Sequence, residues 1–188
     1  MTGHMTGHMT GRLIAVVGPS GVGKDSVMQG IAAASPSAET VQRVITRAPD
    51  AGSEHFMAVS VMRFEEMRAA GAFCLSWGAH GLHYGIPDRV RSQVAGGAEL
   101  LVNLSRGVLP EAHRMFPGLL VLNLTTSPEV LAQRLAGRGR ESADEIERRL
   151  ARAHFALPEG INAVELRNDG PLEQTVAQAL AVVHPVKV

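Results

Sequence analysis

Short apolar runs alternate with helix-compatible segments along most of the chain. Runs such as Leu13-Ile14-Ala15-Val16-Val17 and Leu100-Leu101-Val102 show no polar alternation, so they predict strands buried on both faces of a sheet. Ser60 and the pair Ser127-Pro128 are typical helix starts. The predicted strands are 13–17, 41–47, 73–79, 82–85, 99–104, 119–124 and 163–166, and the predicted helices are 26–34, 61–70, 87–96, 110–115, 127–136, 142–155 and 172–183.

Because strands and helices alternate, the pattern predicts an α/β fold with a parallel sheet and helices on both faces. The stretch 41–85 departs from this alternation. It combines a turn-forming run at 48–54 with two strands joined at His80-Gly81. We therefore expect a small subdomain inserted into the α/β core, where an acceptor substrate can be held.

The composition is that of one globular domain. The 188 residues are enough for one well-packed core, and 45% hydrophobic with 19% charged residues is not the composition of a disordered chain. The formal net charge is zero, so there is no global basic field, and neither nucleic acid nor a membrane is an expected partner. No apolar run reaches membrane-spanning length, and we expect a cytoplasmic protein.

The first residues and the cysteine content set further bounds. Residues 1–11 repeat Met-Thr-Gly-His without a hydrophobic core, so we interpret them as a disordered leader before a single domain at 12–188. Cys74 is the only cysteine, which excludes a disulfide framework or a cysteine-based zinc site within one chain. The oligomeric state is left open.

A glycine-rich segment follows the first apolar run directly and precedes a helix: Gly18-Pro19-Ser20-Gly21-Val22-Gly23-Lys24-Asp25-Ser26. Its glycines let the backbone curl so that successive N–H groups face one anion, and the helix directs its positive end to the same place. Lys24 adds a charge that can reach the terminal phosphates of a nucleoside triphosphate. A plain turn between strand and helix accounts less well for both flanks and the Gly-Lys pair. The segment therefore predicts an ATP-binding P-loop formed by all nine residues.

One position departs from the P-loop pattern. The pattern has Ser or Thr after the lysine, where the hydroxyl contacts Mg²⁺. Here that residue is Asp25, and a hydroxyl comes only at Ser26. A carboxylate is also a good Mg²⁺ ligand, so Asp25 is the predicted metal ligand and Ser26 the open alternative.

Arginines gather near the end of the predicted helix 127–136. Arg134 and Arg138 are four residues apart and therefore share a helical face, which runs into the glycine-flanked segment 137–143. We expect this segment to be a lid over the triphosphate. An arginine carried by a lid stabilises the charge on a transferred phosphoryl group, an effect of roughly 10³–10⁵ in rate.

Several motifs occur in the same order as in the guanylate kinase superfamily, and the resemblance runs from about residue 13 to the end. They are the P-loop, Thr46-Arg47, His80-Gly81-x-x-Tyr84-Gly85, Arg134-Leu135-x-x-Arg138-Gly139 and Glu147-Arg148-Arg149-Leu150. Within that superfamily the chain is similar to the ribose 1,5-bisphosphate phosphokinase family. That similarity rests on Gly23-Lys24-Asp25-Ser26, Ile45-Thr46-Arg47, Ala51-Gly52-Ser53-Glu54, Leu101-Val102-Asn103-x-Ser105-Arg106, Arg138-Gly139-Arg140-Glu141 and Asn168-Asp169-Gly170.

The resemblance implies a P-loop NTPase-type core, ATP with Mg²⁺ as the donor, and a sugar phosphate as the acceptor. Ribose 1,5-bisphosphate would become 5-phosphoribosyl 1-diphosphate, in the salvage of phosphonates. The implied acceptor-binding residues are Arg47, Tyr84 and Ser105. The implied catalytic residues besides Lys24 are Arg138 and Arg149, which face the transferring phosphoryl group. Asn168, near the adenine, and Arg134 complete the ATP site.

The departures from the superfamily bear on the acceptor. Guanylate kinases read guanine with carboxylates, and the corresponding positions here are Leu75, Asn103 and Ser105. Leu75 offers no acceptor to a guanine N–H donor, and a buried unpaired donor costs about 1–3 kcal/mol. A sugar bisphosphate without a base fits better. A nucleoside monophosphate kinase is the alternative enzyme, and a kinase-like binding domain without turnover is the alternative of another class.

Overall fold

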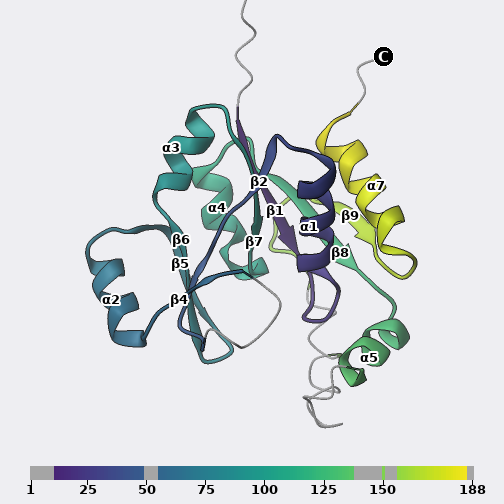
Figure 1. The fold of residues 1–188 in the computed structure, drawn as a ribbon, viewed down its shortest axis with the longest axis horizontal. Helices are drawn as coiled ribbons and strands as arrows, with labels where there is room; N and C mark the ends of the chain where they lie inside the picture. Colours follow the sequence, from purple (N-terminus) through teal and green to yellow (C-terminus); the bar gives the residue numbers. More distant parts are fainter. Residues whose placement is uncertain (1–10, 49–54, 138–149, 151–155, 186–188) are drawn as a thin grey trace, which may run out of the picture.

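The computed structural model describes residues 11–48, 55–137, 150 and 156–185, and its strands form two sheets (Figure 1). The main sheet is parallel and has the strand order β2-β7-β1-β8-β9. The bounds of its strands are β1 Arg12–Val17, β2 Ala38–Thr40, β7 Glu99–Asn103, β8 Leu120–Thr125 and β9 Val164–Arg167. The α/β fold predicted from the alternation of strands and helices is confirmed.

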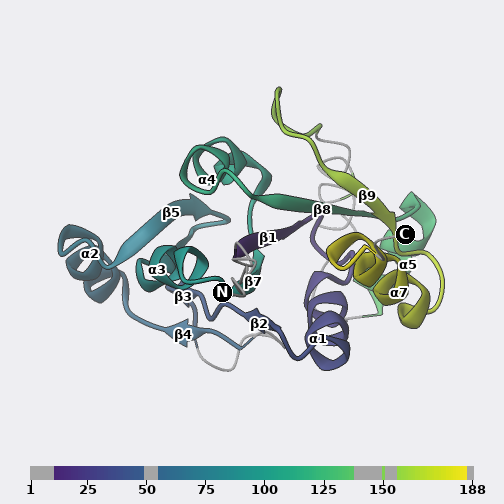
Figure 2. The same ribbon diagram turned by 90° about the horizontal axis from the view of Figure 1, so that it is seen from above.

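Helices cover both faces of the main sheet. α1 (Lys24–Ala34) and α7 (Leu172–Val183) pack side by side on one face, and α4 (Leu109–Met115) lies on the other (Figure 2). Gly30 lets α1 and α7 approach, because a Cβ there would come within 2.5 Å of the Val176 side chain. In the described part of the chain, every helix is too short or too polar to cross a membrane.

The second sheet lies beside the main sheet and has the order β4-β3-β6-β5. Its strands are β3 Val44–Ile45, β4 Met57–Ala58, β5 Phe73–Ala79 and β6 Leu82–Pro87. α2 (Val61–Ala69) packs against β5, and the hydroxyl of Ser60 accepts the hydrogen bond of the Arg63 N–H at its start. α3 (Arg89–Ala95) leads from this sheet back to the main one.

The predicted strand 41–47 is wrong as a single element. Within that range only β3 forms, and the strand before it, β2, ends at Thr40 and belongs to the other sheet. The N–H of Val41 donates a last hydrogen bond to Leu101 O beside β7, and the chain then crosses to the second sheet. β4 was not predicted, and Pro87 ends β6 where it was expected to open a helix. A two-residue strand has no local pattern, so only pairing with its neighbour defines it.

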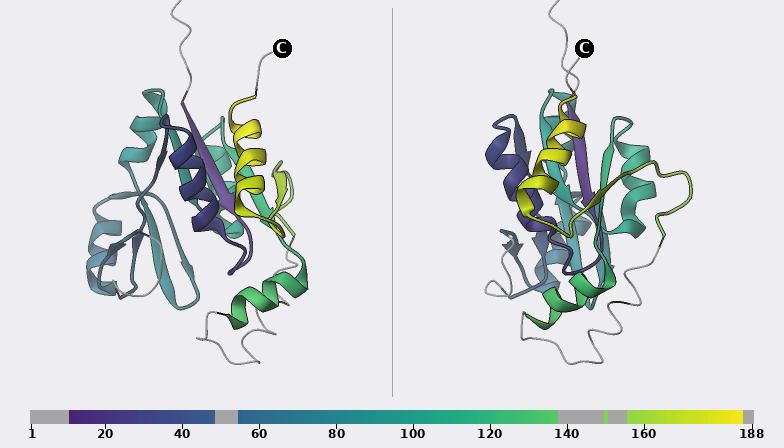
Figure 3. Two further views of the ribbon diagram at one scale, coloured as in Figure 1. Left: turned by 45° about the vertical axis from the view of Figure 1, so that its right-hand side comes forward. Right: turned by 90° about the vertical axis from the view of Figure 1, so that its right-hand side faces the viewer.

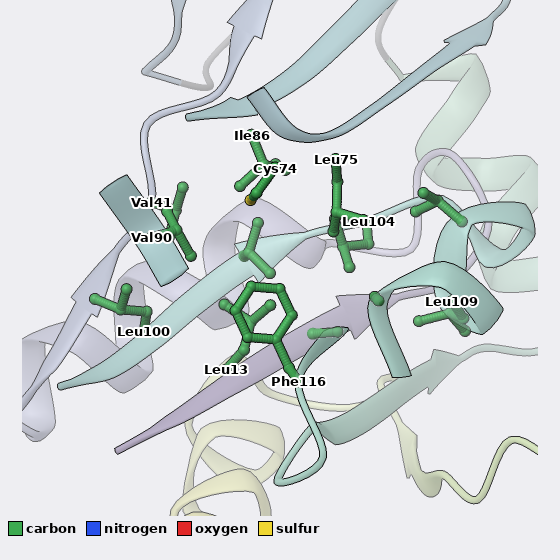
Figure 4. Close-up of a cluster of buried hydrophobic side chains, with 14 of the residues drawn as sticks. Leu13, Val41, Cys74, Leu75, Ile86, Val90, Leu100, Leu104, Leu109 and Phe116 are labelled. Atoms are coloured by element: carbon green, nitrogen blue, oxygen red, sulfur yellow. The ribbon is translucent and has the colours of Figure 1, made fainter. Parts of the chain in front are cut away.

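Two apolar cores hold this arrangement together. One lies under α1 and α7 and includes Ile14, Ile31 and Leu122. The other joins the two sheets, because Leu13 from β1 shares a cluster with Leu75 and other side chains of the second sheet (Figure 4). The second sheet is therefore packed onto the main sheet through buried side chains, not connected by loops alone.

Candidate active site

The P-loop connects β1 to α1 and needs its glycines for steric reasons. Gly18, Gly21 and Gly23 have φ of 147°, 91° and 97°, in the left-handed region that other residues rarely adopt. A Cβ on Gly18 would come within 2.5 Å of Leu124 O, and one on Gly23 within 2.7 Å of Asn168 Nδ2. The loop is therefore tightly packed between its neighbours, and this packing restricts its backbone.

Lys24 begins α1 and folds back over the loop. Its Nζ donates hydrogen bonds to the carbonyl oxygens of Gly18 and Pro19, both at 3.0 Å. Gly23, the N-cap, has no side chain to satisfy the first N–H groups of the helix. The ammonium group and the N-terminal end of α1 thus concentrate positive charge at one place, which suits a polyphosphate.

The carbonyl oxygen of Val22 is the point where the loop is supported from outside. It accepts hydrogen bonds from Asn168 Nδ2 at 2.7 Å and from an Arg134 guanidinium nitrogen at 3.3 Å. Arg134 belongs to α5 (Pro128–Ala136), which lies at the end of the molecule where β1 enters the loop (Figure 3). Both predicted ATP-site residues therefore meet the P-loop, although neither is close to it in sequence.

Both the nitrogen and the oxygen of the Asn168 side-chain amide make hydrogen bonds. Its side chain is 3% exposed, and Oδ1 accepts a hydrogen bond from Thr175 Oγ1 at 2.9 Å. The adenine contact implied by the resemblance stays a prediction. What the structure adds is that Asn168 supports the loop from beneath.

Asp169, the next residue, ties β9 to the start of α5. Its carboxylate accepts hydrogen bonds from Thr126 Oγ1, from Arg167 and from the Ser127 N–H, and in that order they lower its pKa to about 2. The Ser127 hydroxyl in turn accepts the Val130 N–H at the first turn of α5. The position of Arg134 on α5 is fixed by this junction.

Asp25, the predicted metal ligand, lies in the first turn of α1 and contacts β7. Its Oδ1 accepts a hydrogen bond from Asn103 Nδ2 at 3.2 Å. Over the described ranges no three His, Cys, Asp or Glu side chains converge into a metal site. The carboxylate of Asp25 nevertheless fits Mg²⁺, because this ion takes one or two protein carboxylates and completes its shell with waters and phosphate oxygens.

The predicted acceptor residues Arg47 and Tyr84 both belong to the region of the second sheet. Ile45 pairs with Tyr84 across β3 and β6, and the N–H of Thr46 donates to His83 O at 3.1 Å. The guanidinium carbon of Arg47 lies 5.7 Å from the centre of the Phe56 ring.

Tyr84 is 7% exposed and stacks on Trp77, with ring centres 5.3 Å apart. His83 contacts the Phe64 ring, in keeping with a packing role.

Two arginines near the site were not predicted as site residues. Arg43 is 6% exposed, donates to Asn103 O at 3.1 Å and lies over the Tyr84 ring. Arg106 begins the short helix η1 (Arg106–Val108), directly after the predicted acceptor residue Ser105. It lines a cavity of about 120 Å³ together with Pro19 of the P-loop. Burial lowers the pKa of Arg106, which marks a partly desolvated cation beside the phosphate-binding loop.

A sequence signal existed for only one of these two arginines. Arg106 is part of a motif that carries the family resemblance, whereas Arg43 lies in a stretch predicted to be a plain strand. The predicted catalytic residues Arg138 and Arg149, and the proposed lid beyond Gly137, lie outside the described residues.

Most of the chain is similar in sequence to proteins of one named family. No protein-family model matches the chain. It is 52% identical to a ribose 1,5-bisphosphate phosphokinase PhnN from Ruegeria sp. (strain TM1040), over 92% of this chain and 91% of that protein. It is 49% identical to the protein of the same name from Pseudomonas paraeruginosa (strain DSM 24068 / PA7), over 90% of this chain and 94% of that one.

The chain belongs to the ribose 1,5-bisphosphate phosphokinase family. The resemblance drawn from the motifs is thereby confirmed. Among solved structures, the guanylate kinase from Anaplasma phagocytophilum matches with a TM-score of 0.67, covering 93% of this chain and 85% of that one. At 15% identity this likeness shows the fold alone. The sequence thus places the chain in the ribose 1,5-bisphosphate phosphokinase family, and the structural comparison shows that its fold is like that of a guanylate kinase.

Proposed function

We propose that the protein transfers the γ-phosphoryl group of ATP to the 1-phosphate of ribose 1,5-bisphosphate, forming 5-phosphoribosyl 1-diphosphate and ADP. An oxygen of the 1-phosphate forms a bond to the γ-phosphorus. The bond from the γ-phosphorus to the oxygen bridging the β-phosphorus breaks, and ADP leaves with the electron pair. The acceptor oxygen is already ionised at neutral pH, so no general base is needed.

The burial of Leu75 is the observation that carries the choice of acceptor. Leu75 occupies the position where a guanine reader has a carboxylate, and it is 1% exposed within the core that joins the two sheets. Its neighbour Leu104 is also buried there (Figure 4). An apolar side chain committed to the core offers nothing to the N–H donors of a base, which favours an acceptor that has none.

Catalysis in this proposal rests on positioning and on charge neutralisation. The P-loop backbone and Lys24 hold the β- and γ-phosphates of ATP, and Arg134 joins them from α5. Arg138 and Arg149 face the transferring group, and Arg47, Tyr84 and Ser105 hold the acceptor. Asp25 would hold Mg²⁺, with Ser26 the alternative, and the ion would neutralise charge on the phosphate oxygens.

The acceptor is tested by comparing ribose 1,5-bisphosphate with guanosine monophosphate under identical ATP and Mg²⁺. ADP release is followed by a coupled assay, and the product is identified by mass. We expect kcat/KM for ribose 1,5-bisphosphate to be at least about 100-fold higher than for guanosine monophosphate. The phosphoryl transfer is the same for both acceptors, so the difference comes from how well the acceptor pocket binds and orients each one. Equal or faster turnover of guanosine monophosphate would favour the nucleotide kinase alternative, and no turnover of either would favour a binding domain.

A further inference from the structure

Arg43 lies where the two sheets meet, between the last bond of β2 to the main sheet and the start of β3. It is one of only four buried polar or charged side chains among the described residues. A buried guanidinium needs partners, because taking a charge out of water is costly. The partners of Arg43 therefore indicate what the residue is for.

One partner belongs to the ATP side of the site. A terminal nitrogen of Arg43 donates to the carbonyl oxygen of Asn103 at 3.1 Å. Asn103 is the last residue of β7, and its side-chain amide donates to Asp25 at the start of α1. Through Asn103, Arg43 is two hydrogen bonds away from the carboxylate that we propose as the Mg²⁺ ligand.

A second partner belongs to the acceptor side. The guanidinium carbon of Arg43 lies 5.2 Å from the centre of the Tyr84 ring, a distance typical of a cation–π contact. Tyr84 stacks on its cross-strand neighbour Trp77, with an angle of 9° between the rings. The buried Nε1 of Trp77 makes no hydrogen bond to the part of the chain described here. Ring packing and the contact with Arg43 therefore both hold this stack.

We propose that Arg43 is a positioning residue for the acceptor. It fixes the Tyr84–Trp77 stack at a set place relative to β7 and Asp25, so that the acceptor phosphate held near Tyr84 faces the γ-phosphate of ATP. The bond to Asn103 sets the distance between the two halves of the site, and the face of the guanidinium sets the orientation of the Tyr84 ring. This role rests on the proposed function, in which Tyr84 belongs to the acceptor site.

Lysine cannot fill this role completely. A guanidinium presents donors in its plane and a flat face to an aromatic ring at the same time, whereas an ammonium group is a point charge. Arg43→Lys should therefore keep part of the interaction. Arg43→Met should remove the hydrogen bond to Asn103 and the cation–π contact with Tyr84 while keeping most of the side-chain volume.

The experiment measures KM for ribose 1,5-bisphosphate and for ATP in the wild type, Arg43→Met and Arg43→Lys. We expect Arg43→Met to raise KM for ribose 1,5-bisphosphate about tenfold, the factor for losing one charge-assisted hydrogen bond, with KM for ATP within about twofold. Arg43→Lys should raise the acceptor KM by a smaller factor. Arg63→Met is the matched control, because Arg63 is an exposed arginine of α2 that pairs with Glu66 on the surface.

A second readout uses Trp77, the only tryptophan. Adding ribose 1,5-bisphosphate should change its emission in the wild type, and in Arg43→Met the same change should require about tenfold more of the sugar phosphate.

An unchanged acceptor KM in both variants would refute the role of Arg43. Equal rises in both KM values, with a matching loss of stability, would refute it as well, because they indicate a general defect. If Arg43→Met fails to fold, Arg43→Lys decides by the same criteria. If the wild type does not phosphorylate ribose 1,5-bisphosphate at all, it is the proposed function that fails.

Discussion

At the scale of single residues, the P-loop places one cation and one carboxylate next to each other. Lys24 contacts two loop carbonyls, and Asp25 contacts Asn103 from the neighbouring strand. The two residues are consecutive and point to different partners, so each can be changed without removing the contacts of the other.

Lys24→Ala should abolish most of the turnover and leave the fold intact. In the proposed function the ammonium group contacts the terminal phosphates of ATP, and losing such a preorganised contact costs roughly 10²–10³ in kcat. Steady-state kinetics with ATP in excess will measure this, together with a thermal melt to verify folding. A folded variant with near wild-type turnover would contradict the P-loop assignment.

Asp25→Asn should raise the Mg²⁺ concentration needed for half-maximal rate about tenfold, because the amide keeps the shape and one oxygen but loses the charge that attracts the ion. The oxygen of the new side chain can still accept the hydrogen bond from Asn103. Rates are measured over a Mg²⁺ series at fixed ATP, with Ser26→Ala beside it. If only Ser26→Ala shifts the Mg²⁺ dependence, the hydroxyl is the ligand instead.

At the scale of elements, the junction between β9 and α7 determines where the P-loop lies. Asn168 directly follows β9 and donates to the Val22 carbonyl oxygen, while Thr175 of α7 donates to the oxygen of its amide. The neighbouring Asp169 connects the same junction to α5. Elements from the last part of the chain thus hold a loop from its first part.

Asn168→Ala should raise KM for ATP and lower the melting temperature together. Removing the buried amide leaves the Thr175 hydroxyl without this acceptor and weakens the support of Val22, a loss of about 1–3 kcal/mol. Exposed Asn162 provides the control substitution Asn162→Ala, which should change neither quantity. A higher KM for ATP with unchanged melting would indicate instead that Asn168 acts on the nucleotide directly.

Asp169→Asn should destabilise the protein at neutral pH and not at strongly acidic pH. The folded-state pKa is about 2, below the ordinary value of 3.8, so the carboxylate stabilises the fold above that ordinary value. This contribution is lost as pH falls through the folded-state pKa. Urea unfolding of the wild type and Asp169→Asn is measured between pH 7 and pH 3. The difference between their free energies of unfolding should become smaller toward low pH. A constant difference over this range would mean that shape and not charge is responsible.

At the scale of the whole molecule, buried side chains from both sheets share one core, so we expect the two sheets to unfold together. Cys74 of β5 lies in this core (Figure 4). It is 7% exposed, and its Sγ lies near the carbonyl oxygen of Pro87. Burial, followed by the nearby charge of Asp88, raises the pKa of this thiol to about 11. The thiol should therefore be unreactive as long as the sheets stay together.

Cys74 should react with a thiol reagent at pH 8 only at the rate at which the molecule opens. The thiolate is the reactive form, and both burial and the raised pKa suppress it. Labelling is measured by mass against time, in buffer and at urea concentrations up to the unfolding midpoint. Fast labelling in buffer, without loss of secondary structure, would show that the second sheet separates from the main sheet independently.

Much of the fold and part of the site could be predicted because their determinants are local. The P-loop depends on nine consecutive residues, the helix caps at Ser60 and Ser127 on neighbouring N–H groups, and α7 was predicted with the bounds that it has. The hairpin of β5 and β6 follows from an apolar run, a turn and a second run. In each case, spacing along the chain is enough to fix the backbone.

Only the tertiary structure decided which distant side chains share the site. The change of sheet between β2 and β3 depends on pairing with β7 and β6. The placement of Arg43 between Asn103 and Tyr84 follows from that change. Asn168 lies beneath the P-loop because β9 and α7 pack beside β8 and α1. These contacts form by burial and hydrogen bonding between segments that are far apart in the chain. The periodicity of the sequence predicts local elements, but it does not predict which distant segments become neighbours.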